Sequence, residues 1–139
     1  DLTFRGTVEF RSACCQPIHD SMTVAAFHTG LAEKVGELKK LLAKDKVAYG
    51  HGHDAFSLQH LFSRKELPSF VDRKKLREQL LKILRLAEEG LVKRGFGEEV
   101  FLKPLFDRAE RLSNPALDML KGLKEGKTLR DYVAAYGTL

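Results

Sequence analysis

Apolar residues recur at helical spacing over most of this 139-residue chain. Between residues 21 and 44 they fall three or four positions apart, which predicts a long helix capped by Asp20 or Ser21. From Asp72 onward a second stripe predicts the clearest helix of the chain, and Gly95 is placed to end it. The first stripe consists of Val24, Phe27, Leu31, Val35, Leu38 and Leu42, and the second of Leu76, Leu80, Ile83, Leu84, Ala87 and Leu91.

The segments around these two helices have weaker patterns. Residues 44–54 contain two glycines and break the periodicity, which predicts a loop. A short amphipathic segment follows at about 56–62. Residues 98–112 are predicted to form a further helix that is kinked or restarted at Pro104, because a proline inside a helix removes a hydrogen bond and clashes with the preceding turn.

The C-terminal part of the chain contains capping patterns. Asn114 followed by Pro115 is typical of a helix start, and the helix is predicted to run to about residue 125. Thr128 and Asp131 resemble a capping box, with Asp in place of the usual Glu or Gln. They predict a last short helix that ends near Tyr136.

Residues 2–11 differ from the rest because their apolar and polar side chains alternate, which predicts a β-strand. A lone strand leaves its backbone N–H and C=O groups without partners. The strand therefore pairs with a second copy, or the chain is the C-terminal piece of a larger α+β protein whose sheet lies upstream. The chain does not begin with methionine, which favours the second alternative. We expect a mainly α chain with one N-terminal β-strand, forming a single C-terminal helical region over residues 1–139.

Composition places the chain among folded globular proteins, with 43% hydrophobic and 31% charged residues. No apolar run approaches the roughly 18 residues needed to cross a bilayer, so we expect no membrane partner. The only cysteines, Cys14 and Cys15, are adjacent, and neighbouring cysteines rarely form a disulfide. Reduced thiols favour a cytoplasmic location.

The net charge of +5 raises the question of an anionic partner. The lysines and arginines are, however, mixed with 19 acidic residues and form no long basic run. A nucleic-acid-binding domain would gather them on one helix face with aromatic residues nearby. The pattern therefore favours an ordinary solvated surface, and we expect no nucleic-acid partner.

Glu9 and Arg11 lie two positions apart in the predicted strand and so share one face of it. A carboxylate is the type of oxygen ligand that Mg²⁺ prefers. A guanidinium offers a planar fork that matches a carboxylate or a phosphoryl group. On spacing alone, a cross-strand salt bridge on an exposed face is favoured over a functional site.

Two blocks of the sequence resemble the glutamate–cysteine ligase (γ-glutamylcysteine synthetase) family. The first, "GTVEFRSACCQP" with "MTVAAFHTGLAEKV", resembles the family's strand motif of Thr, apolar, Glu, apolar, Arg and the helix after it. The second, "AEEGLVKRGFGEEVFLKPLFDRAERLSNPALDMLKGLKEG", resembles the C-terminal helical region of plant and proteobacterial members. The blocks cover about residues 6–42 and 84–125.

The resemblance implies a C-terminal fragment of a glutamine-synthetase-like α+β ligase, in which an antiparallel sheet forms the active-site funnel and helices lie outside it. Such an enzyme uses ATP and Mg²⁺ to phosphorylate the γ-carboxylate of glutamate, and the cysteine amine then displaces phosphate from the acyl phosphate. This reaction is the first step of glutathione synthesis. In the family the strand Glu is a Mg²⁺ ligand, which corresponds to Glu9. The following Arg contacts the phosphoryl group or the substrate carboxylate, which makes Arg11 the catalytic candidate.

The chain departs from the family pattern after Arg11, where many relatives have an acidic residue and glycines and this chain has residues 12–16, "SACCQ". The other metal ligands and the nucleotide-binding residues of the family would lie upstream. We therefore expect the substrates glutamate, cysteine and ATP to be partners of the full-length parent. The fragment alone is expected to be inactive.

Other residues have an ordinary structural explanation. His51, His53 and Asp54 are of metal-ligating types, but one glycine-rich loop without a further ligand at standard spacing favours solvated side chains. Cys14 and Cys15 lack a CxxC arrangement, so buried thiols are favoured over a redox pair. The remaining candidates, assigned to packing or to surface and inter-helix ion pairs, are His19, His28, Arg94 and Arg108.

One further function class is consistent with the residues. A helical protein-interaction module that dimerises through its lone strand would also satisfy that strand's backbone, by self-association across a two-fold axis. It predicts that the chain folds in isolation. The ligase hypothesis instead predicts several hundred further residues with acidic strand motifs upstream of Asp1.

Overall fold

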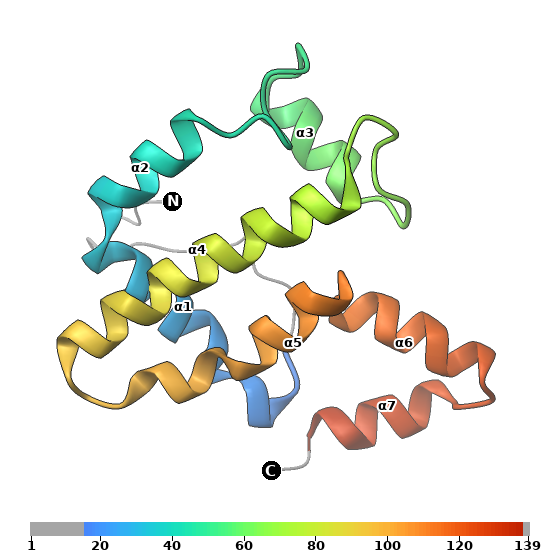
Figure 1. Cartoon of the computed structure of the whole chain (residues 1–139). Helices are drawn as coiled ribbons and strands as arrows, with labels where there is room; N and C mark the ends of the chain where they lie inside the picture. The colour runs from blue at the N-terminus through green and yellow to red at the C-terminus, as the bar shows by residue number, and fades with distance from the viewer. Residues whose placement is uncertain (1–15, 138–139) are drawn as a thin grey trace, which may run out of the picture.

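The structure, a computed structural model, describes residues 16–137. Figure 1 shows the path of the chain. In the element names that follow, η denotes a 3₁₀ helix. The elements in chain order are η1 (Ile18–Asp20), α1 (Met22–Glu33), α2 (Val35–Ala43), α3 (Ala55–Phe62), α4 (Arg73–Arg94), η2 (Glu98–Leu102), α5 (Lys103–Arg111), α6 (Pro115–Lys124) and α7 (Leu129–Tyr136).

The expected fold class, a mainly α chain with one N-terminal β-strand from an α+β ligase, is wrong. Every regular element between residues 16 and 137 is a helix, and this range contains neither a strand nor a sheet. The physical reason is that the long apolar patterns of this range have helical spacing and the segments between them are loops and turns, so none has the alternation of a half-buried strand. The predicted strand, residues 2–11, lies outside the described residues. Within the described range, no helix is both long enough and apolar enough to span a membrane.

Helix α4 is the longest element, with 22 residues, and its ends are set by local capping. The carboxylate of Asp72 accepts a hydrogen bond from the backbone N–H of Lys75 at 2.9 Å, which satisfies one of the free donors of the first turn. At the other end Gly95 adopts the left-handed conformation with φ of 75°, which a residue without Cβ tolerates best. Both ends are where the sequence predicts them.

Helix α1 crosses α4 with the two backbones in direct contact at Gly30 and Gly90. A Cβ added at Gly30 would lie 2.2 Å from the carbonyl oxygen of Ala87, and one at Gly90 would lie 2.1 Å from that of Gly30. Figure 1 shows the crossing near the C-terminal half of α4. This is the most extensive contact between described elements. Only glycine at both positions allows so close an approach.

The hydrophobic core is built around this crossing. Leu91 and Leu102 are the largest fully buried apolar side chains, and Ala26 and Ala87 fill the space beside them. Truncation of a buried leucine typically costs about 2–5 kcal/mol, so the two leucines hold η2 and α4 together. The half-buried residues packed around this cluster are Phe27, Leu31, Leu105 and Phe106.

The helix expected over residues 21–44 is not continuous. It breaks at Lys34, whose φ of −122° lies outside the helical range, and α2 begins at Val35. The Lys34 ammonium lies 3.4 Å from a carboxylate oxygen of Glu89 in α4. Because α1 is anchored to α4 at Gly30, the chain changes direction immediately after the crossing, and Val35 at the start of α2 is 53% exposed.

The C-terminal predictions are confirmed. The 3₁₀ turns of η2 give way to the α-helical turns of α5 at Pro104, which occupies its first turn. The side chain of Asn114 caps α6 by accepting from the N–H of Leu117 at 2.9 Å. Thr128 and Asp131 form the capping box of α7. Figure 1 shows α6 and α7 as a hairpin that extends away from α1 and α4.

We predict that Gly30→Ala destabilises the chain by about 1–3 kcal/mol, because the added methyl group collides with rigid backbone of α4. Gly36→Ala in α2 is the matched control, because an added Cβ there meets nothing within 4 Å. Alanine has the higher helix propensity, so Gly36→Ala should stabilise by up to about 1 kcal/mol. Urea unfolding followed by circular dichroism measures both. Equal stability of the two variants would contradict the observed crossing.

Candidate functional site

The site residues predicted from the sequence, Glu9 and Arg11, lie outside the described residues, as do Cys14 and Cys15. Between residues 16 and 137, no three His, Cys, Asp or Glu side chains lie close enough together to hold a metal ion.

Arg108 joins the start of the described chain to helix α5. Its guanidinium donates from Nη2 to Oδ2 of Asp20 at 2.7 Å and from Nη1 to the side-chain oxygen of Gln16. The side chains of Arg108 and Asp20 are only 13% and 14% exposed, so the ion pair is largely shielded from water. The inter-helix pair expected for Arg108 is thus present. It fixes Gln16, five residues after Arg11, against the second block of the resemblance.

Arg94, the other arginine expected to form a surface or inter-helix pair, contacts one carboxylate just after α4 and one in α1. Its Nε donates to the carboxylate of Glu98 at 2.8 Å, and its Nη1 lies 3.8 Å from Glu33 of α1. The hydrogen bond to Glu98 raises the pKa of the Arg94 guanidinium above its ordinary value. This contact braces the turn between α4 and η2.

The histidines of the 44–54 loop have structural neighbours. The rings of His51 and His53 lie 4.5 Å and 5.1 Å from the ring of Phe70, measured between centroids. Asp54 caps α3 by accepting from the N–H of Ser57 at 2.7 Å, and this hydrogen bond lowers the pKa of the Asp54 carboxyl. The loop predicted from the two glycines is confirmed. The Asp54 carboxylate is engaged in capping α3.

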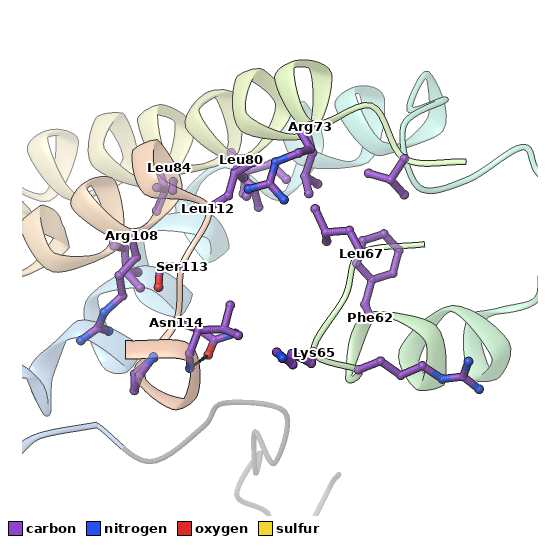
Figure 2. Close-up of a pocket in the computed structure, with 18 of the residues that line it drawn as sticks. Phe62, Lys65, Leu67, Arg73, Leu80, Leu84, Arg108, Leu112, Ser113 and Asn114 are labelled. Atoms are coloured by element: carbon purple, nitrogen blue, oxygen red, sulfur yellow. Dashed lines mark hydrogen bonds between the residues drawn. The ribbon is translucent and has the colours of Figure 1, made fainter. Parts of the chain in front are cut away.

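A groove of about 950 Å³ lies along the N-terminal half of α4. Its floor is the apolar stripe of that helix, Leu76, Leu80, Ile83 and Leu84, of which all but Leu84 are half-buried. Figure 2 shows Leu80 and Leu84 projecting from α4 into the groove. The volume is at the upper end of the range of about 300–1,000 Å³ for ligand pockets, and the floor is apolar, as such pockets usually are.

The walls of the groove come from three other parts of the chain. Helix α1 supplies Val24 and Phe27, and the end of α3 with the connection after it supplies Phe62 and Leu67. The connection from α5 to α6 supplies Leu112, which has a left-handed φ of 48° and ends α5 where glycine is usual. Figure 2 shows Phe62 and Leu67 across the opening from Leu112.

Positive charge is concentrated at one end of the groove. Arg64, Lys65 and Arg73 line it there, next to a single acidic residue, Glu66. Figure 2 shows the side chains of Lys65 and Arg73 extending into the opening. None of the ion pairs found between residues 16 and 137 involves these three cations. The Arg108 guanidinium, which also lines the groove, is paired with Asp20.

The groove was not predicted from the sequence, because a continuous helix over residues 21–44 would be as long as α4, whereas α1 in the structure is much shorter. Helix α4 has 22 residues and α1 has 12, or about 33 Å against about 18 Å at 1.5 Å per residue. Because α1 covers the C-terminal half of α4 around Gly90, the side chains of Leu76, Leu80 and Ile83 near the other end stay half-buried.

The fold and the site therefore define, over residues 16–137, a helical domain with an apolar groove that is basic at one end. Comparison with known proteins adds no relative: no protein-family model, no curated protein and no solved structure matches the chain.

Burial lowers the pKa of His28, which lies in α1 at the edge of the groove, below its ordinary value of 6.5. The folded chain therefore binds this proton less readily than the unfolded chain does, and stability should fall as the pH drops below about 6.5. We predict that His28→Gln reduces the loss of stability between pH 7.5 and pH 5.5, measured by urea unfolding. The control is His60→Gln, at an exposed position of α3. An unchanged pH dependence in His28→Gln would contradict the prediction.

Proposed function

We propose that this chain is the C-terminal part of an ATP-dependent glutamate–cysteine ligase. The proposal starts from the resemblance of residues 6–42 and 84–125 to that family. The observation that supports it best is that the described residues of both blocks pack directly against each other. Gly30 of the first block and Gly90 of the second are in backbone contact, and Arg108 of the second block binds Gln16 and Asp20 of the first.

In this proposal the helical region serves as the support for the segment that contains Glu9 and Arg11. Phosphoryl transfer depends mainly on positioning and on neutralising charge, so a rigid anchor close to the reacting groups has a direct use. The Arg108 contacts hold Gln16, five residues beyond Arg11. When bound, Mg²⁺ would neutralise charge on the phosphoryl oxygens, and Glu9 is the ligand that this chain would supply. Arg11 would orient the phosphoryl group or the glutamate carboxylate through its planar fork.

We predict that, in the full-length parent, Glu9→Gln and Arg11→Lys each lower the turnover about a hundredfold. The amide of Gln keeps the shape of Glu but loses the charge that binds a hard cation. An ammonium cannot make the two-point contact of a guanidinium. Loss of one group that stabilises transition-state charge typically costs about 3 kcal/mol. Phosphate release in the presence of ATP, glutamate and cysteine measures the rates.

His53→Ala is the matched control in this assay, and its activity should be close to that of the parent protein. The chain of residues 1–139 by itself should form no γ-glutamyl product at any Mg²⁺ concentration. The ligase proposal fails if Glu9→Gln and Arg11→Lys both retain the parental rate, because the pair is then a simple salt bridge.

A second candidate function is a helical protein-interaction module, and the groove along α4 favours it. Apolar grooves on helical domains are used to bind amphipathic helices. The strand-mediated dimer expected from the sequence relied on residues 2–11, which lie outside the described residues. Residues between 16 and 117 line the groove.

A further inference from the structure

We propose that the groove along the N-terminal half of α4 binds an amphipathic α-helix of a partner protein, with carboxylate side chains facing Lys65 and Arg73. This inference does not depend on the ligase proposal, because it uses only residues 16–137. It rests on the apolar floor of the groove, on the unpaired cations at one end and on the way the polar groups at the other end are satisfied.

The floor has the spacing that a second helix fits. Leu76, Leu80 and Ile83 lie four and three positions apart, so their side chains form one ridge on α4. All three are only half-buried, although they continue the stripe that α1 covers further along α4. From Leu76 to Leu84 the ridge is about 12 Å long, at 1.5 Å per residue. A partner helix of about three turns would cover it.

The charges at the α3–α4 end indicate the chemistry of the partner. Arg64, Lys65 and Arg73 line this end, and among residues 16–137 no ion pair includes any of them. Figure 2 shows the ends of the Lys65 and Arg73 side chains directed into the opening. Carboxylates on the bound helix would complement these charges and would exclude a basic helix.

The polar groups at the opposite end are already satisfied within the chain. The Ser113 hydroxyl donates to the Asp118 carboxylate at 2.6 Å, and the Asn114 side chain caps α6. The guanidinium of Arg108 is occupied by Asp20 and Gln16. Among the described residues that line the groove, the cationic side chains without an ion pair therefore lie at the α3–α4 end. The partner needs its carboxylates in one terminal turn and apolar side chains beyond it.

A helix fits the groove better than a single hydrocarbon chain. The side chains that border the groove are half-buried at Leu76, Leu80 and Ile83 of the floor and at Phe62, Leu67 and Leu112 facing it. They therefore line a trough and not a closed cavity. A flexible alkyl chain would leave much of this surface in water. A helix, about 10 Å across, presents a whole row of apolar side chains and so covers more of such a trough.

The test uses the full 139-residue chain and three fluorescently labelled helical peptides of about 14 residues, about 21 Å long. The first has a leucine stripe and two glutamates in its first turn, the second has lysines in place of the glutamates, and the third keeps the composition of the first but scrambles the stripe. Fluorescence anisotropy measures binding. The acidic peptide should bind at least about tenfold more tightly than either of the others, which corresponds to about 1.4 kcal/mol.

Two kinds of variant identify the binding surface. The double variant Lys65→Glu with Arg73→Glu changes exposed side chains only, and it should reverse the preference in favour of the basic peptide. Leu80→Asn should weaken binding of the acidic peptide about tenfold. The matched controls are Arg85→Glu, an exposed position of α4 that does not line the groove, and Leu120→Asn in α6, which is 45% exposed outside it. Both should bind like the parent chain, and urea unfolding checks that every variant is folded.

The proposal is overturned if the acidic and basic peptides bind equally, if none binds, or if the double charge reversal leaves the preference unchanged. Hexadecanoate is measured in parallel. If it binds in a way that Leu80→Asn and the charge reversal abolish, while the acidic peptide does not bind, the groove is a lipid site and the proposed helix is wrong.

Discussion

The structure depends on the close approach of helices α1 and α4 at Gly30 and Gly90. At this crossing each glycine lies where any side chain would overlap the backbone of the other helix. Backbones that approach so closely bring Ala26, Ala87 and Leu91 into one buried cluster, on which Leu102 of η2 packs. The ion pairs around the crossing, such as that of Lys34 with Glu89, lie at its partly exposed edge and contribute less.

The same constraint explains where the groove lies. Because α1 is held at Gly90, it covers one half of α4 and leaves the apolar stripe of the other half for the α3–α4 connection and for Leu112 to border. The Arg108 guanidinium, shielded together with Asp20, holds η1 against α5 and so fixes the wall on that side. Removal of either partner would leave an uncompensated charge in a site with little water, which is strongly destabilising.

Local features of the fold were predictable from the sequence because they depend on neighbouring residues only. Asp72 and Gly95 bound α4, and Thr128 with Asp131 opens α7, through contacts that span a few positions. The break at Lys34 was missed because it follows from the crossing with α4, which the periodicity of residues 21–44 does not contain. Residues 16–137 were expected to contain only helices and loops. The fold class was wrong because the alternating pattern of residues 2–11 added a β-strand, and the resemblance added an α+β parent, to the assignment.

The groove was missed in the sequence, and the site residues proposed from the sequence stay predictions. The sequence directed attention to Glu9 and Arg11, which lie outside the described residues, whereas the groove arises from segments as far apart as Val24 and Leu112. Its cations, Lys65 and Arg73, sit in a stretch that also contains acids, so the sequence alone gave no reason to separate them from an ordinary surface. Only the three-dimensional arrangement shows that they border an apolar floor without an ion-pair partner within residues 16–137.

The most direct test of this account is a nuclear Overhauser measurement between the Hα protons of Gly30 and Gly90 in the isotopically labelled chain. The two backbones are in contact in the structure, so a clear cross-peak between these protons is predicted. Absence of that cross-peak in a folded chain with assigned Gly30 and Gly90 signals would contradict the crossing, and with it the core and the groove that depend on it.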